Sequence, residues 1–172
     1  DIAKFLITAG ADLSIRDSQG KTALMHAIDK KMSDLIEVII ASGSGLDEED
    51  FLGWTPLMYA ARYDRKKLVI QLIKAGCNIN HNDKRGKSLL VNCIMNESKV
   101  SLIRYLIESG SDLDTRDCYH KTALMYAACL GRKKVVKLLL ESGADPSMED
   151  SCGMTAVSYA RNNEIKSLLC DL

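Results

Sequence analysis

Long apolar runs, net charge and catalytic motifs are all missing from this chain of 172 residues. No uncharged apolar stretch approaches the ~18 residues that a membrane-spanning helix needs, so the sequence predicts no membrane span. Lys and Arg together number 23, as do Asp and Glu, which gives a formal net charge of zero. Such a chain has no bulk attraction for nucleic acid or anionic lipid, so nucleic acid is disfavoured as a partner.

The residue patterns that carry catalysis or hold cofactors are also absent. The sequence contains no GxSxG, no HExxH and no Gly-rich phosphate loop. Cys118, His120 and Cys152 lack the spacing of metal ligands. We therefore expect no enzymatic activity, no metal and no cofactor.

The six cysteines follow no regular pairing, and none of them forms a CxxC motif. Scattered cysteines in a chain rich in core residues favour a reducing, intracellular compartment, which we take to be the cytoplasm. Cys93 stands where the repeats described next place Ala27, Ala60, Ala127 and Ala160, so we expect a small buried thiol there.

A short phrase recurs five times along the chain. It reads TALMHA from Thr22, TPLMYA from Thr55, SLLVNC from Ser88, TALMYA from Thr122 and TAVSYA from Thr155, with starts 33, 33, 34 and 33 residues apart. An aspartate precedes each phrase, and three residues after it comes a glycine or, once, His120. A fixed period of this size indicates a solenoid of packed supersecondary units.

Each repeat predicts two helices. Thr or Ser begins the first helix by capping its exposed amides, and Pro56 fits the first helical position. Leu57, Ala60 and Ala61 give that helix one buried face. A second apolar stripe follows, as in Leu68, Val69, Leu72 and Ile73, and a glycine with positive φ is expected to end it.

This unit resembles the ankyrin repeat, and the resemblance covers essentially the whole chain. DFLGWTPLMYA at 50–60 is close to the family signature D-x-x-G-x-T-P-L-H-x-A, and Gly143-Ala144-Asp145 matches its G-A-D. The usual histidine after Leu is replaced in every repeat, and repeat three carries one extra residue around Asn96–Ser98. The resemblance implies an all-α ankyrin-repeat solenoid of helix-turn-helix pairs with projecting β-turn or hairpin fingers, four full repeats and partial terminal ones.

We expect a single domain over residues 1–172. The partial first repeat spans 1–16, the full repeats span 17–49, 50–82, 83–116 and 117–149, and a short final repeat spans 150–172. Residues 1–9 form only the second helix of a repeat, so the apolar side chains of Ile2, Phe5 and Leu6 lack a partner helix. A terminal repeat normally has a polar outer face, which suggests a fragment of a longer array.

The resemblance also implies where a partner protein binds, namely on the finger tips and the exposed side of the first helices. Seven of the nine aromatic residues occupy such positions, and large rigid aromatics dominate the energy of protein interfaces. We therefore predict partner-binding residues at Phe51, Leu52, Trp54, Tyr59, Tyr63, Tyr119, Tyr126 and Leu130. A second interpretation stays open, in which the tyrosine before alanine is a packing rung between neighbouring first helices.

The resulting hypothesis is a non-enzymatic adaptor, monomeric or part of a longer chain, that binds another protein through its concave face and fingers. The alternative is a structural or targeting ankyrin segment of a larger, possibly catalytic, multidomain protein. A weaker hypothesis concerns the cations near each helix-helix turn, which include Arg65, Lys66, Arg132 and Lys133. They would form a basic ridge that contacts phosphate, although a solvated edge is the favoured interpretation.

Overall fold

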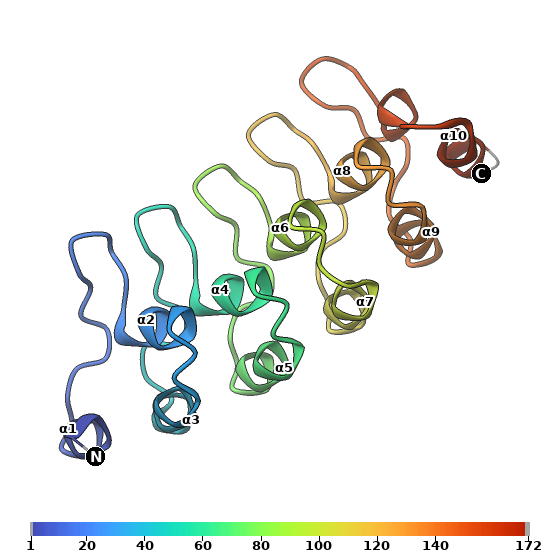
Figure 1. The fold of residues 1–172 in the computed structure, drawn as a ribbon. Coiled ribbons are helices and arrows are strands. Elements are labelled where there is room, and N and C mark those ends of the chain that lie inside the picture. The colour runs from blue at the N-terminus through green and yellow to red at the C-terminus, as the bar shows by residue number, and fades with distance from the viewer. Residues whose placement is uncertain (1, 171–172) are drawn as a thin grey trace. The chain divides into compact units, whose positions relative to one another are not determined.

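The computed structural model describes residues 2–170, which are built from helix pairs joined by projecting loops (Figure 1). The chain divides into two compact units, residues 1–81 and 82–172. This division falls beside the predicted repeat boundary between residues 82 and 83. Asp1 and the predicted end of the last repeat at residues 171 and 172 lie outside the described residues.

The first unit consists of one single helix and two helix pairs. The single helix is α1 (Ile2–Thr8). The pairs are α2 (Ala23–Asp29) with α3 (Ser33–Ser42), and α4 (Pro56–Arg62) with α5 (Lys66–Lys74). Helix α1 packs on α3, and α2 packs on α4. Equivalent helices of neighbouring repeats therefore lie side by side.

The second unit consists of three helix pairs. Its pairs are α6 (Leu89–Met95) with α7 (Val100–Glu108), α8 (Ala123–Cys129) with α9 (Lys133–Glu141), and the 3₁₀ helix η1 (Ala156–Tyr159) with α10 (Asn163–Cys170). No strand forms within residues 2–170, where one isolated bridge pairs Asn82 with Ser88. The predicted all-α class of helix-turn-helix pairs is confirmed.

Four of the five recurring phrases begin an α-helix as predicted. The side chains of Thr22, Thr55, Ser88 and Thr122 accept hydrogen bonds from the amide three residues later, at 3.3–3.5 Å. Leu57, Ala60 and Ala61 are at most 1% exposed, which confirms the buried face of the first helix. Cys93 is 1% exposed, as expected for a thiol in an alanine position.

The fifth phrase departs from the prediction, because Thr155 is followed by η1 and not by an α-helix. Helix α9 begins 11 residues after Thr122, whereas α10 begins 8 residues after Thr155. The three missing residues shorten the first helix from seven residues to four. The position that holds buried Met25, Met58 and Met125 elsewhere is the exposed Ser158 here, so packing does not extend the helix either.

The extra residue of repeat three lies where the sequence predicted it. Three residues separate α4 from α5 and α8 from α9, but four residues, Asn96 to Lys99, separate α6 from α7. Ser98 within this turn is 4% exposed, and its hydroxyl has no hydrogen-bond partner in the described structure.

The predicted exposure of the apolar side of α1 is confirmed. Ile2, Phe5 and Leu6 are 79%, 70% and 51% exposed. The positions equivalent to Leu6 in the later second helices are fully buried, and they are Ile39, Leu72, Leu106 and Leu139. Those four helices each pack on the first helix of their own repeat, a contact that α1 does not make.

Candidate functional site

Each finger is organised by the aspartate at its start. One carboxylate oxygen of Asp50 accepts hydrogen bonds from the amides of Leu52 and Trp54, at 2.8 and 2.9 Å. The same two bonds, to the amides two and four residues later, form in all five fingers, at Asp17, Asp50, Asp83, Asp117 and Asp150. These carboxylates therefore bind the amides of their own turns and hold the fingers in shape.

The second oxygen of each aspartate ties the finger to the first helix that follows it. The side chain nine residues later contacts this oxygen at 2.5–3.3 Å in every repeat, and these side chains are His26, Tyr59, Asn92, Tyr126 and Tyr159. The hydroxyl of Tyr59 donates to Asp50 at 2.7 Å. Burial, reinforced by this bond, raises the pKa of Tyr59 to about 12.

Tyr59, which the sequence predicts to contact a partner, lies mostly inside its repeat. Its side chain is only 5% exposed, so it offers little surface to a partner, and the interpretation as a packing rung fits the structure. A lysine at the end of the preceding finger covers three of these tyrosines. Lys21, Lys87 and Lys121 lie 4.9, 5.3 and 4.3 Å from the ring centres of Tyr59, Tyr126 and Tyr159. These cation–π contacts join neighbouring repeats.

An open groove of about 410 Å³ lies between the first two fingers, and we call it the finger groove. It is lined by Ser18, Gln19, Lys21, Asp50, Phe51, Leu52, Tyr59 and Arg62. The amide of Phe51 donates to the carbonyl of Gln19 at 3.1 Å, which holds the two fingers together. The side chains of Phe51 and Leu52 are nevertheless 59% and 67% exposed.

Trp54 forms the base of an aromatic and cationic cluster beside the groove. Its ring is half-buried and meets that of Tyr59 edge-on, with centres 5.6 Å apart. The guanidinium of Arg62 lies over the Trp54 ring, 5.6 Å from its centre. The exposed Arg62 side chain is thus held in place by an aromatic surface.

Tyr63 stands close to the same face but has a different environment. It is 42% exposed, and its hydroxyl donates to Asp29 at 3.1 Å. Asp29 also pairs with Lys21, at 2.9 Å, and this bond raises the pKa of the lysine. Partial burial raises the pKa of Tyr63, and the bond to Asp29 adds to the shift.

The structure brings together only some of the predicted residues. Phe51 and Leu52 share the finger groove with Tyr59, and Trp54 touches this set through the Tyr59 ring. Tyr119, Tyr126 and Leu130 belong to the second unit, where Tyr119 is 60% exposed and the other two are half-buried. Lys21 and Arg62 also line this groove but were not predicted, because the prediction rested on large aromatic and apolar side chains. Both nevertheless occupy positions that the motif leaves variable.

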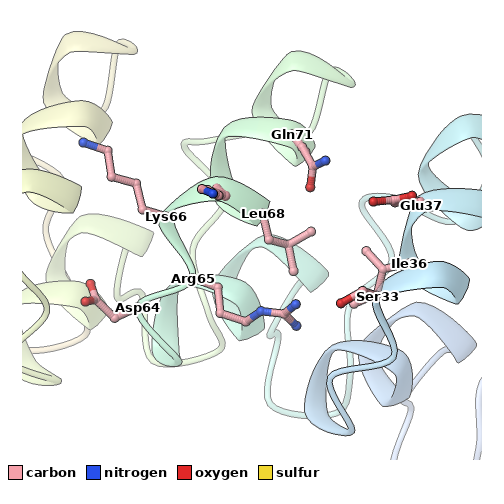
Figure 2. A pocket seen from close by; sticks show the side chains of 9 residues that line it. Ser33, Ile36, Glu37, Asp64, Arg65, Lys66, Leu68 and Gln71 are labelled. Atoms are coloured by element: carbon pink, nitrogen blue, oxygen red, sulfur yellow. The ribbon is translucent and has the colours of Figure 1, made fainter.

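A second hollow, of about 450 Å³, opens between α3 and α5 in the first unit. Figure 2 shows the Arg65 side chain extended toward Ser33 and Ile36, while Lys66 points away from them. The Arg65 guanidinium is 3.5 Å from the carbonyl of Ile28. In the second unit Arg132 donates in the same way to the carbonyls of Ile94 and Ser98. These two arginines of the basic ridge bind backbone carbonyls and are not free cations.

The part of the chain that the structure describes contains no group of three His, Cys, Asp or Glu residues able to hold a metal ion. Among those same residues, no helix has the length and apolar character needed to cross a bilayer.

Among known protein families, the chain matches the model described as ankyrin repeats (3 copies). It covers residues 1–83 and 65–150, and therefore most of the chain. A search of curated proteins found no match.

Proposed function

Because the chain belongs to the ankyrin repeat family, whose repeats generally serve as protein–protein interaction modules, we propose that it is a non-enzymatic adaptor that binds another protein. The proposed binding surface is the finger side of the helix pairs, centred on the finger groove. Fold alone does not decide between binding surfaces, so the proposal rests on the residues that line the groove.

The exposure of Phe51 and Leu52 carries the proposal. Two adjacent large apolar side chains project from one finger tip, and Tyr63, directly after the following helix, adds an exposed aromatic ring. Exposed apolar groups that cluster above polar neighbours are typical of interaction surfaces, and aromatic side chains dominate the binding energy there. The hydrogen bond between Phe51 and Gln19 orders the tip before binding, which lowers the entropy lost when a partner docks.

An affinity capture experiment tests the proposal. The native chain and a Phe51→Ala, Leu52→Ala, Tyr63→Ala variant are each immobilised and exposed to lysate of the source cell, and the retained proteins are identified and then purified. These three side chains are exposed, so their removal leaves the core intact, whereas half-buried Trp54 is left unchanged. We expect a protein retained by the native chain to be lost from the variant.

A control distinguishes this surface from general apolar stickiness. Met32→Ala removes a side chain that is 46% exposed from the turn between α2 and α3 in the same unit. It should retain the partner like the native chain. A purified partner that binds the triple variant as tightly as the native chain would move the interface elsewhere.

A further inference from the structure

We propose that the finger groove selects a partner segment in which an acidic side chain lies next to a large apolar one. This inference rests on the proposed function and specifies the chemistry of its partner. The acidic side chain would bind the guanidinium of Arg62, and the apolar one would pack on Phe51 and Leu52.

The charge balance of the groove supports the acidic part of the segment. Lys21 is neutralised by Asp29, at 2.9 Å, and Arg16 on the first finger pairs with Glu48. The carboxylate of Asp50 is 3% exposed and accepts three hydrogen bonds within its own repeat. Arg62 is exposed and forms no ion pair with any described residue, so its positive charge faces solvent uncompensated.

The position of Arg62 makes it suited to a carboxylate. Its guanidinium lies over the Trp54 ring, which fixes the plane of the donors before a partner arrives. Planar donors of this kind pair with carboxylates in a two-bond geometry. One uncompensated cation matches one carboxylate, whereas a phosphate dianion would require a second free cation that the Lys21–Asp29 pair does not supply.

The apolar part of the segment follows from the neighbours of Arg62. Phe51 and Leu52 line the same groove and leave most of their surface open. A partner that presented only acidic residues would leave this surface in water. A large apolar side chain beside the acidic one would cover it and gain the free energy of apolar burial.

Selection from a random peptide library displayed on phage tests the inference without a known partner. Peptides enriched on the native chain are sequenced, synthesised with a fluorescent label, and titrated by anisotropy. We expect Asp or Glu beside Leu, Ile, Phe, Trp or Tyr in the enriched sequences. Arg62→Glu should weaken their binding about tenfold or more, the loss typical of a contributing interface residue.

Three comparisons make the result specific. Lys74→Glu changes the same charge at the exposed end of α5, and it should leave the affinity nearly unchanged. Arg62→Gln, which removes the charge without reversing it, should have an intermediate effect. Selection on the Arg62→Glu variant should enrich Lys or Arg where the native chain enriches Asp or Glu. Circular dichroism and the melting temperature establish that each variant is folded.

Enriched peptides without an acidic preference would overturn the inference, as would acidic peptides that bind Arg62→Glu with native affinity. A selection that yields no peptide dependent on Arg62 would overturn it as well. None of these results would overturn the proposed binding surface. That surface is rejected only if the captured protein binds the Phe51→Ala, Leu52→Ala, Tyr63→Ala variant as tightly as the native chain. The two failures are therefore distinguishable.

Discussion

The hydroxyl of Tyr59 lies 2.7 Å from Oδ2 of Asp50, at the start of the same repeat. Both side chains are buried, so this hydrogen bond joins the second finger to α4 in a place largely shielded from water. Loss of the hydroxyl would leave a buried carboxylate oxygen without its donor, which is costlier than loss of an exposed bond.

We expect Tyr59→Phe to lower the free energy of unfolding by about 1–2 kcal/mol. Equilibrium urea unfolding followed by circular dichroism measures the change. Tyr63→Phe is the matched control, because it removes a hydroxyl whose bond to Asp29 lies on a 42% exposed side chain. It should cost clearly less, and equal losses in the two variants would contradict the account.

The same bond predicts how stability depends on alkaline pH. The pKa of Tyr59 rises from 10 in the unfolded chain to about 12 in the folded one, so the folded state favours the protonated hydroxyl. Its contribution is fully present below pH 10 and disappears as the pH rises through about 12. Tyr59→Phe should flatten the loss of stability in this window.

The thiol of Cys77 titrates in an overlapping range, because burial raises its pKa from 9 to about 12. The comparison is therefore between the native chain and Tyr59→Phe, both of which retain the thiol. Thermal unfolding at a series of alkaline pH values provides the two curves, and parallel curves would count against the assignment.

His120 is expected to cost stability where the other fingers have glycine. It adopts a φ of +58°, a left-handed conformation, and its exposed side chain gains no buried contact in return. We expect His120→Gly to stabilise the chain by about 1 kcal/mol, measured by urea unfolding. Gly86→Ala provides the converse, because a Cβ there would lie 3.1 Å from the Cα of Asp117. A destabilised His120→Gly variant would refute this explanation.

The inserted turn of repeat three contains a second residue whose substitution is expected to stabilise the chain. The hydroxyl of Ser98 is buried without a partner in the described structure, which costs about 1–3 kcal/mol relative to a satisfied group. Ser98→Ala should therefore raise the melting temperature. Ser88→Ala, which removes the cap of α6, should lower it by destabilising the chain by about 1 kcal/mol. A lower melting temperature for Ser98→Ala would mean that the Ser98 hydroxyl forms a stabilising hydrogen bond, which contradicts this prediction.

Much of the fold could be predicted because the signals are local and repeat. Capping residues such as Thr55 and glycines that end helices act within a few residues, so the sequence contains all the information needed to place them. The 3₁₀ form of η1 departs from the repeat pattern because α10 begins three residues sooner after Thr155 than α9 does after Thr122, a shortening that depends on where the second helix begins in the folded chain.

The candidate site was only partly predictable. Exposure at Phe51 and Leu52 follows from their place at a finger tip, but burial of Tyr59 depends on a bond to a residue nine positions earlier. A usable signal existed, since the side chain nine residues after every finger aspartate can donate a hydrogen bond. The pairing of Lys21 with Asp29, which leaves Arg62 in the groove without an ion pair, could not be predicted from the sequence, because it depends on which side chains meet in the folded chain.

The fluorescence of Trp54 offers the most direct test of the proposed interface, because it is the chain's one tryptophan and it touches both Tyr59 and Arg62. Titration with the purified partner should shift its emission in a saturable way, with the dissociation constant found by calorimetry. The shift should require higher partner concentrations in the Phe51→Ala, Leu52→Ala, Tyr63→Ala variant. A partner that binds by calorimetry while the Trp54 emission stays unchanged, with equal affinity for the variant, would contradict binding at the finger groove.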